Sequence, residues 1–356
     1  MCSSDLTARY DYETRKSIVV PRGNRLALLF NVTRDGYNGD VRLRFDGLPA
    51  GITAEDAVVA AGVSAVPVVF TAAADAPVTG LLLRPRAEPV KAEAVPVASS
   101  FRHTVDWVRI QNDTVYVRSE VDRIAAAVVE PVPFRVSVGV PGVPLVQSGE
   151  LGIKVTAERD AGFEEAIAVK LLWSPPGVSA QPEVVIPKGK SEIVYKLSST
   201  ARADVRRSPI VVVASATVKG GSAWVSSQAV PVEVAPAFLN GRMDLAKVER
   251  GKSGRMVCVL EVKTPFEGEA EARLAGLPDG ITAAPVMIRA ESREAVFEIA
   301  TTDKSPVGTH KNLSCRVEVR QAGEPVVHII AAGSVLRVDA PRGGASLASA
   351  EPARAP

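Results

Sequence analysis

The chain has 356 residues, which is enough for two or three domains that each bury a core of their own. Hydrophobic residues make up 46% of it, and this fraction excludes an intrinsically disordered protein. The formal net charge is +2, with 42 Lys and Arg against 40 Asp and Glu, so the composition gives no basis for a nucleic-acid partner. No stretch approaches the roughly 18 uninterrupted apolar residues of a membrane helix, so we expect no membrane insertion.

A proline-glycine turn occurs three times along the chain. Residues 47–54 and 276–283 both read Gly-Leu-Pro-x-Gly-Ile-Thr-Ala, and residues 174–180 are a looser version. The turn glycines at 51, 177 and 280 are 126 and 103 residues apart. A repeat of roughly 100 residues is the size of one immunoglobulin-like antiparallel β-sandwich. The sequence therefore predicts an all-β chain of three tandem immunoglobulin-like sandwiches in an elongated arrangement.

The first predicted domain spans residues 8–132. Leu26, Leu28 and Phe30 recur with the period of two of a strand that has one buried face. The segment at 41–45 repeats the pattern after a turn, and a further strand is expected at about 66–71.

An insert at about 90–132 makes the first repeat longer than the second. It contains Phe101, Trp107 and Tyr116. We favour an extended hairpin of the first sandwich over a connecting element packed against the second. The three aromatic residues suit either a buried hairpin or an exposed recognition surface, and the buried hairpin is the simpler interpretation.

The second predicted domain spans residues 133–235. Its expected strands are 134–138, 151–157, 167–173, 193–197, 210–218 and 227–234. The apolar run at 210–213 is typical of a strand in the middle of a sheet. Trp173 shares the inward phase of its strand with Ile167 and Val169, which predicts a core tryptophan.

The third predicted domain spans residues 236–341, and a small-residue, proline-rich tail at 342–356 is expected to be disordered. Cys258 and Cys315 lie 57 residues apart, on inward phases of strands that face each other across the core of such a sandwich. The pair therefore has the separation and the facing geometry for an inter-sheet disulfide. Two buried free thiols are the other interpretation, and the sequence leaves both open.

Residues with catalytic chemistry are sparse. The three histidines, His103, His310 and His328, have no metal-ligand spacing and form no recognisable triad. Gly251-Lys252-Ser253 resembles the end of a phosphate loop, but it precedes a strand rather than a helix. We therefore expect no catalytic residues, no cofactor and no metal, and we expect that the chain is not an enzyme.

The chain resembles the tandem immunoglobulin-like repeats of large exported bacterial proteins, which often also carry pre-peptidase C-terminal domains. The resemblance rests on the turns at 47–52 and 276–281 and on the segments 306–315, 323–328 and 336–341. It covers most of residues 8–341. The resemblance implies an extracellular or cell-envelope location and transfers no catalytic residue.

The expected function is a non-catalytic structural, spacer or adhesive module of an exported bacterial protein. Its partners would be an unknown protein or glycan at the cell surface and the upstream domains of the same polypeptide. The alternative is an accessory carbohydrate- or protein-binding region of a secreted hydrolase whose catalytic domain lies upstream. A linear row of exposed aromatic residues would favour that alternative, and converging acids or histidines near His310 and His328 would favour an enzyme.

The start of the chain suggests a fragment. Residues 1–20 contain no apolar run of signal-peptide length, so a signal peptide is not present in this chain. Phe134 and Phe238 open the second and third domains 43 and 42 residues before the turn glycine. The same distance before Gly51 reaches Ala8. We therefore expect a C-terminal fragment of a longer exported protein.

Overall fold

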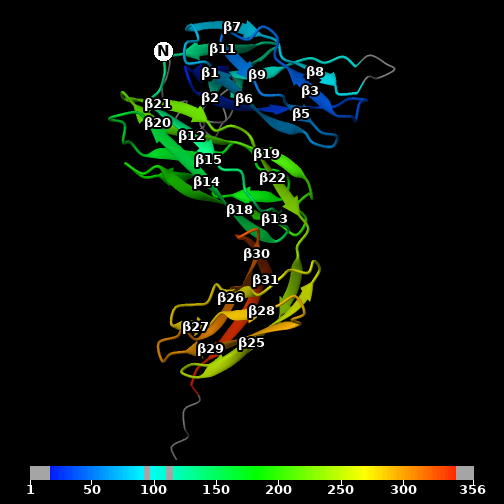
Figure 1. Ribbon diagram of the computed structural model, residues 1–356, viewed down its shortest axis with the longest axis vertical. Helices are drawn as coiled ribbons and strands as arrows, with labels where there is room; N and C mark the ends of the chain where they lie inside the picture. Colours follow the sequence, from blue (N-terminus) through cyan, green and yellow to red (C-terminus); the bar gives the residue numbers. More distant parts are fainter. Residues whose placement is uncertain (1–16, 92–96, 110–114, 342–356) are drawn as a thin grey trace, which may run out of the picture. The chain divides into compact units, whose positions relative to one another are not determined.

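The computed structural model describes residues 17–91, 97–109 and 115–341, and for residues 105–109 the backbone alone. Predictions about Cys2, the start of the first domain at residue 8 and the disordered tail at 342–356 lie outside these residues. All 31 elements of the described part are β-strands, arranged in several sheets (Figure 1). This confirms the predicted all-β class.

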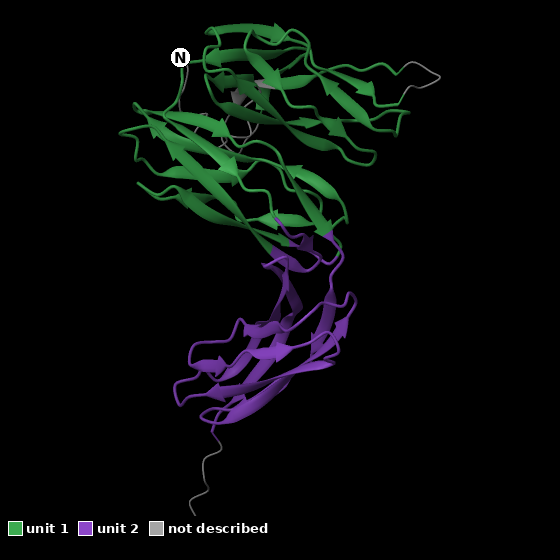
Figure 2. Cartoon of the chain, in the orientation of Figure 1, with its two compact units in different colours: residues 1–141, 151–198, 202–234 green, residues 142–150, 199–201, 235–356 purple. Residues whose placement is uncertain are grey.

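The chain divides into two compact units (Figure 2). Unit 1 comprises residues 1–141, 151–198 and 202–234, and unit 2 comprises residues 142–150, 199–201 and 235–356.

The N-terminal half of unit 1, residues 17–129, folds around one core. Its strands are β1 (Ser17–Pro21), β2 (Arg25–Asn31), β3 (Val41–Arg44), β4 (Ile52–Ala54), β5 (Val58–Val59), β6 (Ala65–Ala72), β7 (Thr79–Leu83), β8 (Arg86–Pro89), β9 (His103–Arg109), β10 (Val115–Val121) and β11 (Ile124–Val129). Three sheets, ordered β1-β11-β7, β2-β6-β4 and β5-β3-β8, contribute side chains to the core. The rings of Phe30 and Phe70 each pack edge-on against Phe45, at centroid distances of 5.0 and 5.1 Å. The sheets are consistent with a β-sandwich.

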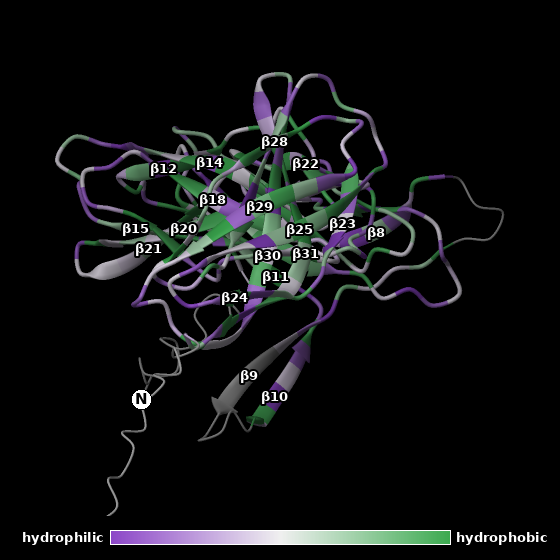
Figure 3. Cartoon of the chain, turned by 90° about the horizontal axis from the view of Figure 1, so that it is seen from below, coloured by the Kyte–Doolittle hydropathy of each residue, from purple (hydrophilic) through white to green (hydrophobic). Residues whose placement is uncertain are grey.

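The predicted insert forms two different structures. Strands β9 and β10 pair only with each other among the described strands. Figure 3 shows β10 apart from the larger sheets. Strand β11 instead joins the sheet of β1 and β7, parallel to β1. Phe101 packs against the core, Tyr116 is 65% exposed, and the side chain of Trp107 is not among those described.

The C-terminal half of unit 1 contains ten further strands, some of which run one or two residues into unit 2. They are β12 (Phe134–Val138), β14 (Gly149–Arg159), β15 (Ile167–Leu171), β16 (Val178–Ala180), β17 (Val184–Ile186), β18 (Glu192–Ser199), β19 (Arg207–Ile210), β20 (Val212–Val218), β21 (Gly221–Ser226) and β22 (Val230–Ala235). The strand orders are β12-β14-β18-β16 and β17-β15-β20-β21, and β19 pairs with β22.

The single strand predicted at 210–218 is split at Val211. Strand β19 pairs with β22, whereas β20 pairs with β15 and β21, so the chain passes from one sheet to another at this residue. The returning segment of this hairpin is also divided, because β21 ends at Ser226 and β22 begins at Val230. Next to the break, the Val212 N–H donates to the Ser227 hydroxyl, and the Ser227 N–H donates to the Val212 carbonyl. Strands β7 and β8 show the same change of sheet, because β7 pairs with β11 and β8 with β3.

Trp173 is half-buried, so its prediction as a core residue is wrong. Strand β15 ends at Leu171, and the Leu172 N–H donates to the Val211 carbonyl, which extends the β15–β20 register by one residue. Trp173 therefore lies beyond the strand. The fully buried aromatic residues of this half are Phe134 and Tyr195, and the Tyr195 hydroxyl accepts a hydrogen bond from the Leu171 N–H.

Unit 2 has two facing sheets. Its strands are β13 (Leu145–Val146), β23 (Leu239–Met243), β24 (Ala246–Glu249), β25 (Ser253–Val262), β26 (Ala270–Ala275), β27 (Ile281–Ala283), β28 (Val286–Ile288), β29 (Glu294–Thr301), β30 (Gly308–Gln321) and β31 (Glu324–Asp339). One sheet is ordered β23-β25-β29-β27, and in the other β31-β30-β26-β28 is extended by β24, parallel to β31. Phe297, Val317 and Leu313 are among the residues buried between them.

A common strand order recurs along the chain. In each of three sheets a strand pairs with the strand four places later in the chain, which in turn pairs with the strand between them. These groups are β2-β6-β4, β14-β18-β16 and β25-β29-β27. The elongated series of three immunoglobulin-like domains, with boundaries at 133 and 236, stays a prediction.

The repeated turn has the same geometry in all three copies. Gly51, Gly177 and Gly280 have φ values of 82, 78 and 74°, which favour glycine. In each copy the residue after the glycine donates its N–H to the proline carbonyl three positions earlier, at 2.9 to 3.1 Å. A Cβ on Gly177 would lie 2.5 Å from the Ala203 Cα, so the turn also packs tightly against a neighbouring loop.

We predict that Gly177→Ala destabilises the fold by about 2–4 kcal/mol, because it adds a backbone clash to the cost of a left-handed alanine. Gly162→Ala is the matched control: its φ is 83°, but no atom lies within 4 Å of its added Cβ, so about 1 kcal/mol is expected. Chemical denaturation measures both. Equal losses would show that packing against Ala203 contributes nothing.

Candidate functional site

The structure brings the two predicted cysteines together. Cys258 in β25 and Cys315 in β30 come from the two facing sheets of unit 2, and both are fully buried in the same apolar cluster. They are free thiols joined by a side-chain hydrogen bond. This bond lowers the pKa of Cys258, and together with burial it raises the pKa of Cys315. The disulfide stays a prediction, and the structure places both cysteines in the same buried cluster.

The three histidines have different surroundings. The His310 ring nitrogen Nε2 contacts the Pro306 carbonyl at 3.1 Å, while His103 packs beside Phe101. His328 is 1% exposed, and its Nε2 accepts a hydrogen bond from the Phe238 N–H at 3.1 Å. Burial lowers the pKa of His328 to about 4, although the carbonyls of two neighbouring residues oppose the shift. His328 is therefore a neutral core residue at pH 7.

Other chemical features can be stated for the described residues. Within them, no group of three or more His, Cys, Asp or Glu side chains is placed to hold a metal ion. The same part of the chain forms no helix that could span a bilayer.

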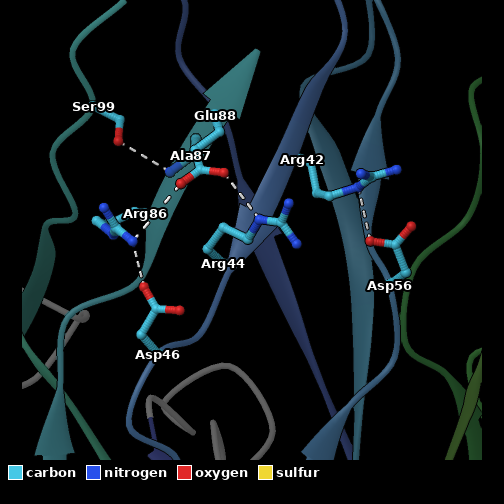
Figure 4. Close-up of polar contacts among 8 residues, drawn as sticks. All are labelled: Arg42, Arg44, Asp46, Asp56, Arg86, Ala87, Glu88 and Ser99. Carbon is cyan, nitrogen blue, oxygen red and sulfur yellow. Dashed lines mark hydrogen bonds and ion pairs between the residues drawn. The ribbon is translucent and has the colours of Figure 1, made fainter. Parts of the chain in front are cut away.

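The sheet β5-β3-β8 carries a row of exposed ion pairs, which we call the charged face (Figure 4). The Arg42 Nε lies 2.9 Å from Asp56, and the Arg44 Nε lies 3.0 Å from Glu88. Arg86 contacts both Glu88 and Asp46. In the β3–β8 register Arg42 lies opposite Glu88 and Arg44 lies opposite Arg86, and Glu88 contacts both Arg44 and Arg86.

The charged face is a hydrated surface rather than a stabilising element. Solvent screening leaves exposed pairs of this kind with little net stabilisation. Since its cations and anions are paired with one another, the face has little net attraction for a partner of either charge.

The two halves of unit 1 meet at a buried joint. We define the joint by Ala27 and Val69, on the outward side of β2 and β6, and by Val211, Leu172 and Ala229 of the C-terminal half. Ala27, Val69 and Val211 are at most 2% exposed. Trp224 of β21 also packs against the core of the N-terminal half. Apolar side chains of both halves therefore share one buried contact.

Polar contacts surround the joint. The Asn24 side chain is 5% exposed and donates through Nδ2 to the Phe134 carbonyl at 2.8 Å. The Arg135 Nε donates to the Gly23 carbonyl at 3.2 Å. Burial raises the pKa of Glu55, while a hydrogen bond from the Ala229 backbone opposes the shift. Each contact links residues that are far apart in the sequence.

A small cavity of about 280 Å³ opens beside these contacts. Asn24, Arg25, Arg135, Ser137 and Glu158 line it, so both charges are present. Its volume lies just below the usual range for small-molecule sites, and no cluster of like charges selects a ligand.

Sequence reasoning missed the joint. The available signal was the uninterrupted run Ala65-Val66-Pro67-Val68-Val69-Phe70, because burial of one face alone would leave every second residue polar. In the structure all six of these residues are buried. The sequence could have indicated a second covered face, but not which residues cover it.

We predict that unfolding free energy falls as the pH is lowered from about 6.5 toward 4, because an unfolded histidine takes up a proton that folded His328 excludes. The contribution of this one group approaches about 3 kcal/mol at the acid end. When the unfolding free energy is measured by denaturation across this pH range, its dependence on pH should be weaker for His328→Gln than for the unmodified chain. His310→Gln is the control and should keep the native slope, whereas equal slopes for all three chains would contradict the prediction.

We also predict that refolding in an oxidising buffer links Cys258 to Cys315. Closing this loop raises the unfolding free energy by about 4 kcal/mol in the chain-entropy model. Peptide mapping by mass spectrometry detects the link, and Cys258→Ala is the control. Recovery of both residues as alkylated thiols after oxidative refolding would contradict the prediction.

No family model matches the sequence, and no curated protein matches it. Solved structures that are similar to parts of the chain include the following three. A protein of unknown function from Porphyromonas gingivalis W83 is 12% identical, with 58% of this chain and 100% of that chain covered and a TM-score of 0.21. A chimeric titin Z1Z2-Z1Z2 tandem is 10% identical, with coverages of 56% and 94% and a TM-score of 0.20. The adhesin InvE of Yersinia pseudotuberculosis is 12% identical, with coverages of 55% and 58% and a TM-score of 0.20. These low scores carry no argument about what the chain does.

Proposed function

We propose that the chain is a non-catalytic structural spacer or adhesive module of an exported bacterial protein, located outside the cell or in the envelope. In this role it holds neighbouring domains at a fixed spacing and leaves its outer faces and end loops free for a protein or glycan partner. Upstream domains of the same polypeptide would be the parts that it spaces.

The observation that carries the proposal is the joint within unit 1. Neighbouring domains move relative to each other by default unless their interface is apolar and well packed. Here Val69 and Val211 are 1% and 0% exposed, so separation of the two halves would expose buried valines to water. A spacer needs this resistance to bending.

The polar contacts also support a rigid spacer, because hydrogen bonds depend on the relative orientation of the groups that they join. The Asn24 bond to Phe134 and the Arg135 bond to Gly23 fix the rotation of one half about the other, which apolar contact alone does not. A buried amide that lost its partner would cost about 1–3 kcal/mol. The two halves of unit 1 would thus behave as one rigid body.

The three-domain organisation belongs to the same proposal. The common strand order and the shared geometry of the turns at Gly51, Gly177 and Gly280 support three copies of one sandwich module. In such a module specificity resides in loops and outer faces, while the inner faces supply stability.

An accessory glycan-binding region would need exposed aromatic rings on one face. Among the side chains that the structure describes, Tyr116 is the aromatic residue that is more than a third exposed. One ring gives a single stacking position, so the spacer or adhesive role has the better support.

We predict that spin labels at Asp75→Cys and Lys188→Cys, one in each half of unit 1, give a narrow distance distribution in pulsed electron paramagnetic resonance. Both sites are exposed, and Cys2→Ser prevents labelling at residue 2. Adding Val69→Asp should broaden the distribution, because it places an unpaired carboxylate in the joint. Val185→Asp, on an exposed part of β17, is the matched control and should leave it narrow. A broad distribution in the chain that retains Val69 would refute the rigid spacer.

A further inference from the structure

The outer edge of β7 is unpaired in the described part of the chain. Strand β7 pairs through Thr79–Leu83 with β11 on one side, and no other described strand pairs with it on the other (Figure 1). A strand edge of this kind presents N–H and C=O groups that another strand can satisfy.

The edge lacks the features that normally prevent pairing. Strand β19 is its counterpart in the C-terminal half, since both strands precede a change of sheet. That edge carries Pro209, which cannot donate a hydrogen bond, and Arg207, which is paired with Glu233. Strand β7 reads Thr-Gly-Leu-Leu-Leu, without a charge or a proline. One edge is protected and the other is open.

The face next to this edge is also apolar. No residue of β1, β11 or β7 is charged, although charged residues make up 23% of the chain. The register places Val19, Ala127 and Gly80 in one row on the outer face. Val19 is 38% exposed, and Leu82, two residues along from Gly80, is 61% exposed. The charged face described above has the opposite composition within the same half.

We propose that β7 pairs antiparallel with β7 of a second copy of this chain, joining two three-stranded sheets into one six-stranded sheet. The inference goes beyond the proposed function and does not depend on it. Because the pairing relates two identical edges, it has the closed two-fold symmetry that limits assembly to a dimer.

The sequence of β7 is complementary to itself in one register, centred on Leu81. Residues that lie directly opposite in an antiparallel pair share a face. In this register Leu82 lies opposite Gly80 of the second copy, so a large exposed side chain meets a position that has none. Leu81 lies opposite Leu81 of the second copy and covers the 38% of its surface that is exposed in one chain.

Charge favours a second copy over other occupants. A two-fold axis brings the residues nearest to it close to identical residues, so self-pairing requires that the residues near the axis are uncharged. The β1-β11-β7 face meets this requirement and the charged face does not. A five-residue edge buries less than the roughly 1,200 Å² of a stable interface, so the dimer should be weak and depend on concentration.

The first test is sedimentation equilibrium of the full chain over a wide concentration range. We expect the average mass to rise above the 37.5 kDa of one chain as concentration increases. Leu82→Lys should weaken association at least about tenfold, because it places two like charges across the pairing, with their Cα atoms about 8 Å apart, at a site that is already exposed. Val194→Lys, at a 59% exposed position on β18, is the matched control and should associate as the unmodified chain does. A chain that stays monomeric, or one that Leu82→Lys leaves unchanged, overturns the proposal.

The second test addresses the register. In a Cys2→Ser background, Leu81→Cys should form an intermolecular disulfide on mild oxidation, because the two residues lie opposite each other. Leu82→Cys should not form this disulfide, since the Cα atoms of residue 82 in the two copies lie about 8 Å apart in this register, beyond disulfide reach. Leu82 is the more exposed of the two, so random collision predicts the reverse order. That reverse order, or equal yields, would overturn the β7 pairing.

Discussion

The burial of β6 on both faces is the constraint on which unit 1 depends. Val68 faces the core of the N-terminal half, whereas Val69 faces the joint. One short strand therefore contributes to two apolar contacts at once. A substitution in β6 would therefore affect both the stability of the N-terminal half and its contact with the C-terminal half.

Local features of this fold could be predicted from sequence, because their causes are local. The turns at Gly51, Gly177 and Gly280 follow from a backbone conformation that favours glycine, and the inward phases of Cys258 and Cys315 follow from strand periodicity. The break at Val211 could not be predicted, because it depends on which strand lies alongside each part of the hairpin. The joint was missed for the same reason: the sequence of β6 shows that both faces are covered, but the covering residues lie more than 100 positions away.

The outer surfaces of the N-terminal half differ in their content of charged side chains. The face of β5-β3-β8 is covered by paired arginines and carboxylates, whereas the face of β1-β11-β7 is small and uncharged. Both faces belong to one module of about 110 residues, so the difference does not arise from overall composition. Contact with the charged face would require desolvation of ionised groups, whereas contact with the β1-β11-β7 face would not.

The parallel pairing of β1 with β11 has a mechanical consequence. The chain enters this sheet at Ser17 and leaves it at Val129, so tension on its two ends acts along both strands in opposite directions. The hydrogen bonds between them are then loaded together, whereas an antiparallel hairpin pulled at its open end loses its bonds one after another. Strands β24 and β31 repeat the parallel arrangement in unit 2. In both places, tension along the chain would load the hydrogen bonds of the parallel pair in shear.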